Sequence, residues 1–326
     1  MATRLRDIAE KAGVSITTAA HVMRGYTGSR IKQETRDRVI QIATELGYRP
    51  NAIARSLKTQ QPHAIGIYTG YGYHSLRDPF MAEVYTGIQF ACRELHYDFI
   101  VHGDIEGKTP DEIRLKLCDG KVTGLVVHAP PDDPVVASLS GGELPAVAIA
   151  DRQTAMPSLV ADDEQGMRLL LDYLWERGHR RILYLTSHVP LASVDARSQT
   201  LARLLAERGT EFAIMRFDHE QPTETLQRLL TLPNRPTAVC CWNDYYAYVL
   251  IAKCLEAGVR IPDDLAIVGF DGLLERRLPA RRLVTVAVPW EEMAAEAVRM
   301  IVKQVQGIVL PSVTTFPTTL IPGDTA

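Results

Sequence analysis

The stretch AGVSITTAAHVM, residues 12–23, places a short turn in front of a helical segment with small and polar side chains. Gly13 is typical of the residue that ends a helix, and Ser15 can cap the next helix by accepting a hydrogen bond from a free backbone N–H. The segment before the turn carries apolar residues at helical spacing, namely Leu5, Ile8, Ala9 and Ala12. Two helices joined by a short Gly-containing turn predict a helix-turn-helix.

A third helix is expected over residues 33–46, followed by Gly47. One face of this helix is apolar and would close a small core with the first two helices: Val39, Ile42, Ala43 and Leu46. In a helix-turn-helix the second helix enters the major groove of DNA with its N-terminal residues leading. Thr hydroxyls can bond to bases or phosphate, His21 to guanine N7 or O6, and Ile16 suits a thymine methyl. The DNA-contacting residues predicted here are Ser15, Ile16, Thr17, Thr18, His21 and Arg30.

The charge of the chain is divided unevenly. Residues 1–61 hold 11 Lys and Arg against 5 Asp and Glu, a net charge of +6, so the remaining residues carry −9 of the total of −3. A small basic segment on a large acidic body indicates that only the basic segment meets a polyanion such as DNA. A solvated basic surface without a nucleic-acid partner is the alternative.

Residues 49–61 follow the third helix and begin with a proline break. Pro50 cannot continue the preceding helix and favours a new one over residues 51–57, which is too short to be stable alone. Leu57 lies between two polar residues and has no core to enter. Either this segment is a flexible linker with a chance Leu, or it folds against DNA and inserts Leu57 into a minor-groove step.

Composition sets the broad class of protein. With 326 residues, 46% of them hydrophobic, the chain can bury the cores of two or three domains. No segment approaches the roughly 18 uninterrupted apolar residues of a membrane span, and the first residues lack a secretory apolar region, so a cytoplasmic protein is expected. The five cysteines include no CxxC pair and are interpreted as reduced core thiols, with Cys240 and Cys241 pointing to opposite faces of a strand.

The body of the chain alternates strand-like apolar runs with amphipathic helical stretches. The expected strands cover residues 64–69, 98–103, 123–128, 145–150, 181–186, 212–217, 237–242 and 266–271. This alternation, with nearly continuous apolar strands, predicts an α/β fold with parallel sheets covered by helices on both faces. Two repeats of the pattern, broken near residues 161–162, indicate two lobes.

Polar side chains follow several of these strands, where open α/β sheets bind their ligands. Asp151 follows residues 145–150, Trp-Asn-Asp at 242–244 closes another strand, Asp271 ends the last, and Arg197 is expected to open a helix. Carboxylates, an amide and an Arg around an aromatic face fit a polyhydroxylated ligand. A structural interpretation stays open, because Asp244 suits a helix cap and Asp151 or Asp271 suits a cap or a turn.

Several segments resemble the lactose/galactose-repressor family of bacterial transcription regulators. The likeness is carried by DIAEKAGVS, ETRDRVIQIATELGYRPN and AIARSL near the start, and by DPFMAEVYTGI, RRILYLT, PTAVCCWND, GVRIPDDLAIVGFD and LVTVAVPWEEM in the body. It extends along nearly the whole chain. The resemblance implies a periplasmic-binding-protein-like core with the effector between its lobes and a chain that crosses between them more than once.

The resemblance also implies domain limits. The helix-turn-helix head is expected at residues 1–48, the hinge helix and linker at 49–61, and the core at 62–326. Within the core, the N-lobe is expected at about 62–161 plus 290–318, and the C-lobe at about 162–289 plus the C-terminal end. In this family the hinge helices of two subunits pair, and the Leu matched by Leu57 enters the central minor groove of a palindromic operator.

The site residues follow from the same resemblance. Hinge contacts to DNA are expected from Asn51, Ala54, Arg55 and Leu57. The residues that match those binding sugar hydroxyls are Asp151, Arg197, Asn243 and Asp271, beside an apolar wall of Phe80 and Met81.

The chain departs from the family pattern near the expected ligand. The loop at residues 70–78 is longer than usual and contributes Tyr71, Tyr73 and His74, which could add aromatic walls. Trp242 stands where a small residue is usual, which predicts a tighter or more aromatic pocket than that for a simple hexose.

The head also departs from the family pattern. Ala20 and His21 replace a common Ser-Arg pair, which puts one guanine contact and one phosphate contact in doubt.

Other classes of function fit the sequence less well. Residues 70–75, GYGYHS, lack the third Gly of a dinucleotide-binding loop, and no nucleophile, acid-base carboxylate pair or metal-ligand spacing stands out. We therefore predict a homodimeric repressor, associated with the nucleoid, that binds palindromic double-stranded operator DNA under control of a small effector, a sugar or sugar derivative. No enzyme activity, cofactor, metal or membrane partner is expected. The alternative is a cytoplasmic small-molecule binding protein or an enzyme on the same α/β core.

Overall fold

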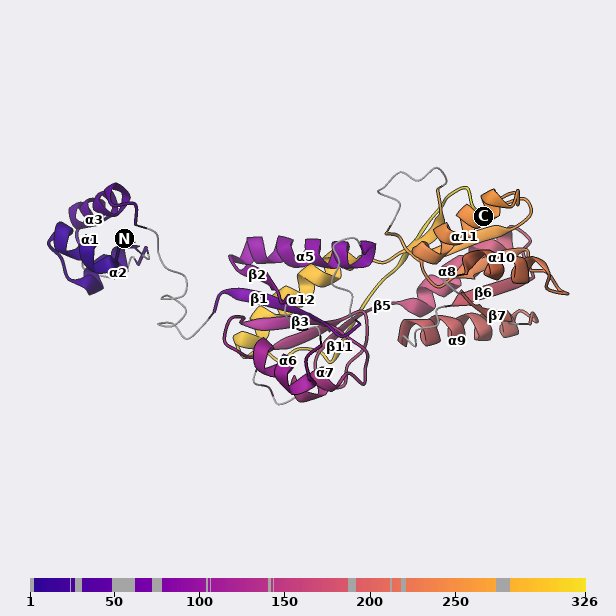
Figure 1. Cartoon of the computed structure of the whole chain (residues 1–326), viewed down its shortest axis with the longest axis horizontal. Coiled ribbons are helices and arrows are strands. Elements are labelled where there is room, and N and C mark those ends of the chain that lie inside the picture. The colour runs from indigo at the N-terminus through magenta and orange to yellow at the C-terminus, as the bar shows by residue number, and fades with distance from the viewer. Residues whose placement is uncertain are drawn as a thin grey trace. The chain divides into compact units, whose positions relative to one another are not determined.

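The computed structural model describes residues 3–23, 25–26, 31–48, 62–71, 78–103, 105, 107–139, 142, 144–186, 192–211, 213–217, 221–273 and 282–326. The chain divides into two compact units, Met1–Pro62 and His63–Ala326, which are described separately. Figure 1 shows the first unit as a small group of helices and the second as two groups of strands with helices around them.

Three helices form the first unit, namely α1 (Leu5–Ala12), α2 (Ile16–Met23) and α3 (Gln33–Glu45). α1 ends at Gly13, whose φ of 62° lies in the left-handed region that favours glycine. The Ser15 hydroxyl accepts a hydrogen bond from the backbone N–H of Thr18 at 3.1 Å, as a helix cap does. The core between the helices contains Ile8, Ala9, Ala12, Ala19, Val22, Val39 and Ala43. The predicted helix-turn-helix is confirmed.

Two six-stranded sheets form the second unit, one in each lobe. The first has the order β11-β5-β4-β3-β1-β2, with all its neighbours parallel. Its strands are β1 (Ala64–Thr69), β2 (Asp98–Val101), β3 (Gly124–His128), β4 (Ala146–Ile149), β5 (Ser158–Ala161) and β11 (Val313–Phe316). The second has the order β12-β10-β9-β8-β6-β7, in which only β12 pairs antiparallel. Its strands are β6 (Ile182–Thr186), β7 (Ala213–Arg216), β8 (Ala238–Cys241), β9 (Ala266–Asp271), β10 (Val284–Ala287) and β12 (Thr319–Ile321).

Helices cover both sheets. Those of the first lobe are α5 (Pro79–Leu95), α6 (Pro110–Leu117), α7 (Pro134–Leu139) and α12 (Trp290–Val305). Those of the second lobe are α8 (Asp163–Glu176), α9 (Ala192–Glu207), α10 (Pro222–Leu230) and α11 (Asp244–Glu256). α12 packs on α5 and on β3 and β4, whereas α8 packs on α9 and α11 packs on α10.

The close packing of α5 on α12 depends on a glycine. A Cβ atom at Gly87 would lie 2.0 Å from the backbone oxygen of Glu291 and 2.8 Å from the Cβ of Ala294. Only a residue without a side chain allows the two helices to approach to this distance. α12 is thereby fixed in the first lobe, although the strands before it belong to the second.

The predicted two-lobed parallel architecture is confirmed. All eight expected strands are present, with ends that differ by at most two residues, and the chain passes between the lobes after β5, after β10 and after β11. Four strands were not expected from the sequence, namely β5, β10, β11 and β12. They are short. β11 contains two adjacent Thr residues and β12 begins with one, so neither shows the continuous apolar run that marked the others.

The cysteine side chains pack in the cores of the second unit. Cys240 packs in one core cluster and Cys241 in another, so their side chains point to opposite faces of β8, as predicted. Within the part of the chain that the structure describes, no helix has the length and apolar character needed to cross a membrane.

Candidate DNA-binding head and ligand site

The N-terminal part of α2 offers the exposed side chains that the sequence predicted. Ile16 is 50% exposed, Thr17 is exposed, and Thr18 and His21 are half-buried. Ala20 is buried in the head, so it does not face outward at all. The exposed surface of the helix therefore begins with an aliphatic and a hydroxyl side chain and ends with an imidazole.

Local contacts hold two of these side chains in place. The hydroxyls of Ser15 and Thr18 lie 2.9 Å apart, so each can restrict the rotation of the other. The ring of His21 lies 5.2 Å from the ring of Tyr26, measured between centroids, and the Tyr26 backbone N–H donates to the His21 carbonyl. Tyr26 is exposed beside His21 and was not among the predicted DNA contacts. An exposed aromatic residue just after a short polar helix is the signal that could have identified it.

Several predicted site residues lie outside the described residues. These are Arg30, Asn51, Ala54, Arg55 and Leu57 of the head and hinge, and Tyr73 and His74 of the loop after β1. The hinge helix and the contacts of these residues stay predictions from the sequence.

Asp151 lies at the carboxyl end of the first sheet, directly after β4, and its side chain is almost completely buried. The hydroxyl of Tyr71 donates to Asp151 Oδ2 at 2.7 Å. Aromatic rings continue from there, with centroid distances of 4.7 Å from Tyr71 to His128 and 4.9 Å from His128 to Phe80. Phe80 in turn lies edge-on to Trp290 at 4.8 Å. The carboxyl group is thus placed at one end of an aromatic wall.

Burial controls the charge of this group. Burial raises the pKa of Asp151 to about 6, an effect that the Tyr71 hydrogen bond partly offsets. Burial lowers the pKa of His128 to about 4. The imidazole is therefore neutral near pH 7, and its Nδ1, 3.9 Å from Asp151 Oδ2, forms no ion pair with the carboxylate. Asp151 has a neutral hydroxyl as its hydrogen-bond partner.

Arg197 lies across the site in the second lobe, where it is 3% exposed. Its Nε donates to Asp163 Oδ1 at 2.7 Å and its Nη1 donates to the carbonyl oxygen of Trp242 at 2.7 Å. Nη2 lies 3.7 Å from Asp271 Oδ1, and the guanidinium carbon lies 3.7 Å from the ring centroid of Phe270. The sequence-based expectation that Arg197 opens a helix is wrong, because α9 begins at Ala192.

Asp163 is a site residue that sequence reasoning missed. It is the first residue of α8 and follows β5, one of the strands that the sequence did not predict. Had that strand been recognised, its carboxyl end would have pointed to Asp162 and Asp163. Asp162 instead caps α8, because its Oδ1 accepts from the backbone N–H of Gln165 at 2.9 Å.

Two further carboxyl groups lie at the end of β9. Asp271 has a φ of 114°, a strained conformation for a residue other than glycine, and burial raises its pKa well above the ordinary value, against the effect of Arg197. Asp244 is 1% exposed and accepts hydrogen bonds from the backbone N–H of Leu273 and the hydroxyl of Thr285. Burial raises the pKa of Asp244 to about 7. Gly269 makes room for it, since a Cβ there would lie 2.3 Å from Asp244 Oδ1.

The interpretation of Asp244 as the helix cap is corrected. Asn243 caps α11, because its Oδ1 accepts from the backbone N–H of Tyr246 at 3.0 Å, and Asp244 is the first helical residue. The side-chain NH2 of Asn243 donates to none of the described residues. Asn243 therefore has a structural role through its oxygen and a donor left for another partner.

The expected apolar wall is only partly exposed. Phe80 is half-buried, but Met81 is completely buried in the core, so it supports the wall from behind and does not line it. Trp242 is half-buried, and its ring packs 5.6 Å from that of Tyr246. Its indole edge lies against the core clusters of the second lobe.

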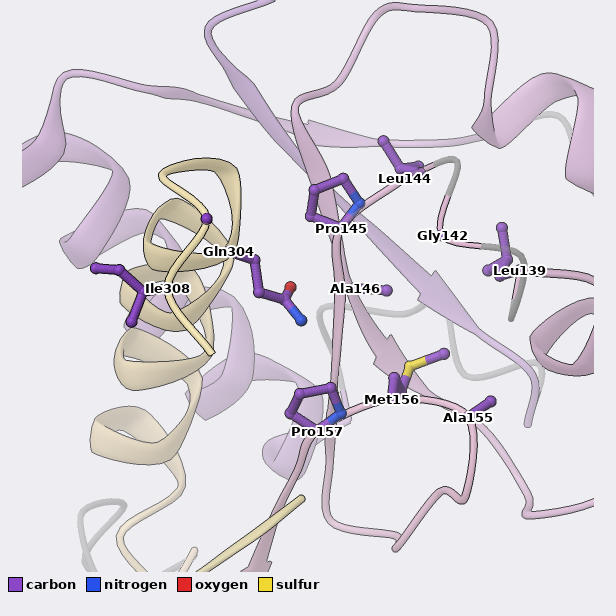
Figure 2. Close-up of a pocket in the computed structure, with 11 residues that line it drawn as sticks. Leu139, Gly142, Leu144, Pro145, Ala146, Ala155, Met156, Pro157, Gln304 and Ile308 are labelled. Atoms are coloured by element: carbon purple, nitrogen blue, oxygen red, sulfur yellow. The ribbon is translucent and has the colours of Figure 1, made fainter. Parts of the chain in front are cut away.

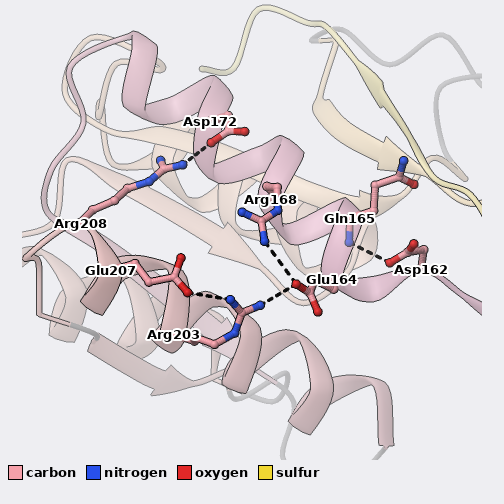
Figure 3. A network of polar contacts seen from close by, with 8 residues as sticks. All are labelled: Asp162, Glu164, Gln165, Arg168, Asp172, Arg203, Glu207 and Arg208. Carbon is pink, nitrogen blue, oxygen red and sulfur yellow. Dashed lines mark hydrogen bonds and ion pairs between the residues drawn. The ribbon is translucent and has the colours of Figure 1, made fainter.

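Ion pairs between α8 and α9 support the position of Arg197 (Figure 3). Glu164 accepts from Arg168 at 3.2 Å and from Arg203 at 2.7 Å, and Arg203 also pairs with Glu207. A further pair joins Arg208 of the following turn to Asp172. These exposed contacts are individually weak, but the Glu164–Arg203 pair joins the same two helices that the Arg197–Asp163 pair joins.

A cavity of about 350 Å³ lies at the other end of β4. Figure 2 shows Leu144, Pro145 and Ala146 at the start of β4, with Gln304 and Ile308 of the α12 end opposite. Its described lining holds no ionisable side chain. It lies at the amino end of the strand and so apart from Asp151, which follows the carboxyl end.

Comparison with known proteins separates the two units in the same way. The profile of the bacterial regulatory proteins of the lacI family matches residues 4–51, and that of the periplasmic binding protein-like domain matches residues 171–326. The HTH-type transcriptional repressor PurR of Vibrio cholerae serotype O1 (strain M66-2) is 29% identical over 326 residues, covering 94% of this chain and 92% of PurR. The probable HTH-type transcriptional repressor ExuR of Bacillus subtilis (strain 168) is 27% identical over 298 residues, covering 89% and 88%.

Solved structures share the fold over the whole chain. A lac repressor dimer bound to operator and the anti-inducer ONPF has a TM-score of 0.86 at 23% identity, covering 100% of this chain and 99% of that one. A complex of the transcriptional regulator CelR with cellobiose has a TM-score of 0.72 at 23% identity, covering 99% and 100%. Head and core together define a DNA-binding transcriptional repressor with a ligand-binding core, not an enzyme. The chain belongs to the lacI family of bacterial regulatory proteins.

Proposed function

We propose that this protein is a homodimeric repressor whose affinity for a palindromic operator is controlled by a small polyhydroxylated ligand, a sugar or sugar derivative, bound in the core. The observation that carries the proposal is the placement of Asp151 with its Tyr71 partner and of Arg197 with its Asp163 partner after the carboxyl ends of strands in the two sheets. Ligands of α/β folds bind at these ends.

The residues of the site suit hydroxyl groups. The carboxyl oxygens of Asp151 and Asp271 accept hydrogen bonds, whereas Arg197 and the NH2 of Asn243 have donors that described residues do not use. Phe80 and Tyr71 offer flat apolar surfaces beside Asp151, as ring-shaped ligands require. The solved CelR complex, which has the same fold, contains the sugar cellobiose.

The head supports binding to specific DNA. α2 begins with exposed Ile16 and Thr17, and the wider segment 1–61 is basic while the rest of the chain is acidic. A two-fold dimer would present two such helices to the two halves of a palindrome. The solved lac repressor of similar fold is a dimer bound to its operator.

Ligand and operator are coupled by linkage. If the ligand binds one arrangement of the lobes more tightly, and that arrangement binds operator with a different affinity, each partner changes the affinity of the other by the same factor. Arg197 and Asp163 connect α8 with α9 at the site, so a ligand that contacts Arg197 acts on both helices.

Two steps test the proposal on the full chain. Selection from a random DNA pool should yield an inverted repeat, which then serves as a labelled probe in fluorescence anisotropy. A thermal-shift screen of sugars, sugar acids, sugar phosphates and nucleobases should yield a ligand that raises the melting temperature and changes operator affinity. Asp151→Asn should reduce the response, and Asp111→Asn, an exposed carboxylate of α6, should not. Selected sites without symmetry, or a ligand response unchanged in Asp151→Asn, would contradict it.

A further inference from the structure

Among the described residues, acidic groups outnumber cations around the ligand site. The negative charges of Asp244, Asp163 and Asp78 raise the pKa of Asp271, in addition to its burial. The charge of Asp163 likewise raises the pKa of Asp151. Arg197 is the cation that interacts with Asp151, Asp163, Asp244 and Asp271 among the described residues. We propose that the site selects against negative charge, so that its ligand is a neutral or amino-bearing polyol and not a sugar phosphate or a sugar acid. This inference rests on the proposed function and names the ligand class of the same site.

The guanidinium of Arg197 is already engaged by protein groups. Asp163 accepts from Nε at 2.7 Å, the carbonyl of Trp242 accepts from Nη1 at 2.7 Å, and Asp271 lies 3.7 Å from Nη2. An incoming carboxylate or phosphate would have to share this cation with two carboxyl groups that already surround it. Like charges within a few ångströms in a buried site repel strongly, because little water screens them.

The other carboxyl groups have neutral partners. Asp151 accepts from the hydroxyl of Tyr71, and Asp244 accepts from the hydroxyl of Thr285 and the N–H of Leu273. Asp78, at the start of α5, accepts from the backbone N–H groups of Phe80 and Met81. None of these hydrogen bonds brings a positive charge to the carboxyl groups.

Buried hydroxyl groups provide an independent observation that points to a polar ligand. The hydroxyl oxygens of Tyr184 and Thr186, both on β6 and both completely or almost completely buried, have no hydrogen-bond partner among the described residues. Tyr184 interacts electrostatically with Arg197 and Asp163, so it lies near the same charged residues of the ligand site. Buried hydroxyls without partners carry a cost that a hydroxyl-bearing ligand would remove.

Ligand binding should also release a proton. Asp151 faces Tyr71 after β1, His128 at the end of β3, Asp163 on α8 and Arg197 on α9, and its folded-state pKa is about 6. Hydroxyl or ammonium donors from a ligand stabilise the ionised carboxylate and so lower this pKa. The affinity for such a ligand should fall as the pH is lowered through about 6, because the carboxyl group must then lose a proton to bind.

The test uses the full chain and matched sugars. Galactose, galactosamine, galacturonate and galactose 1-phosphate, and the same four forms of glucose, are titrated by calorimetry at about pH 7.5 and about pH 5.5. We expect each acid and each phosphate to bind at least about tenfold more weakly than its neutral parent at the higher pH. Tighter binding of the acid or phosphate overturns the charge selection while leaving the proposed ligand site intact. Failure of every compound of the wider thermal-shift screen to bind or to change operator affinity overturns the proposed function together with the inference.

Two further experiments distinguish an effect of the Asp151 charge on ligand affinity from an effect of its packing. The first uses a variant, and the second compares two buffers. Asp151→Asn should reduce the ratio between the dissociation constant of each anionic sugar and that of its neutral parent. Asp111→Asn should leave this ratio unchanged. If the Asp151 variant does not fold, titration of wild-type protein near pH 6 in two buffers of different ionisation enthalpy gives the same answer. Net release of a proton on binding supports the inference, and net uptake or no exchange contradicts it.

Discussion

Arg197 Nε donates to Asp163 Oδ1 at 2.7 Å, with the guanidinium buried and the carboxylate partly exposed, so one ion pair joins α8 to α9 at the ligand site. Asp163 is the first residue of α8 and Arg197 lies in the second turn of α9, and the exposed pair of Glu164 with Arg203 is a second connection between the same helices. A ligand that contacts Arg197 therefore acts on two helices at once.

Removal of this guanidinium should destabilise the core. Arg197→Ala leaves the buried Asp271 and the partly exposed Asp163 without their cation, which should lower the free energy of unfolding by about 3–5 kcal/mol. Arg197→Lys keeps the charge but loses the forked geometry, so its loss should be smaller. Urea unfolding of the three proteins measures both effects. Operator binding should persist wherever the variants are folded, whereas the ligand response should be lost; a wild-type response in Arg197→Ala would contradict the site.

The buried carboxyl groups should make stability depend on pH. The pKa of Asp244 is raised from 3.8 to about 7 in the folded protein, so the folded state keeps a proton that the unfolded state releases at lower pH. Its contribution to stability is fully present below about pH 4 and is lost as the pH rises to about 7. Asp244→Asn should flatten this part of the profile in urea unfolding, and Asp111→Asn should not. An equal slope in Asp244→Asn and wild type would show that Asp244 ionises normally.

Gly87 should be irreplaceable at the contact between α5 and α12. A methyl group there meets the Glu291 backbone oxygen, which cannot move without displacing α12, so Gly87→Ala should cost about 1–3 kcal/mol of stability. Gly103→Ala is the matched control, because no atom lies within 4 Å of its added Cβ. Equal melting temperatures of the two variants would rule out the close approach of α5 to α12.

His21 should contribute to base preference in the head. If it contacts guanine, His21→Arg should sharpen the preference for G at one symmetric pair of operator positions by about 1–3 kcal/mol, because the guanidinium binds guanine in a bidentate way. His21→Ala should flatten that preference and leave the others. Binding-site selection with the three proteins decides the matter. Identical base preferences, with changes only in affinity and salt dependence, would show that His21 contacts phosphate.

The sequence predicted those elements whose local signals are strong. Gly13 and Ser15 set the ends of the helices in the head because their chemistry acts within one turn, and the apolar strands of both lobes were recognised from their continuous runs. β5 was not predicted because its sequence SLVA is short, and Asp163, which follows it, was therefore not recognised as a site residue. The cap at Asn243 and the burial of Met81 depend on packing between elements distant in sequence. Spacing along the chain could place these residues near the site but could not say which way they face.

The most direct test of the account measures the coupling between operator and ligand. Operator affinity of the full chain is determined by anisotropy with and without a saturating ligand from the screen, and ligand affinity is determined by calorimetry with and without operator. One ratio compares the dissociation constant for operator with and without ligand, and the other compares the dissociation constant for ligand with and without operator. Linkage requires these two ratios to be equal and different from one, and Asp151→Asn should bring both toward one. A ligand that binds the core tightly while operator affinity stays the same at every ligand concentration would contradict the claim that the core controls the head.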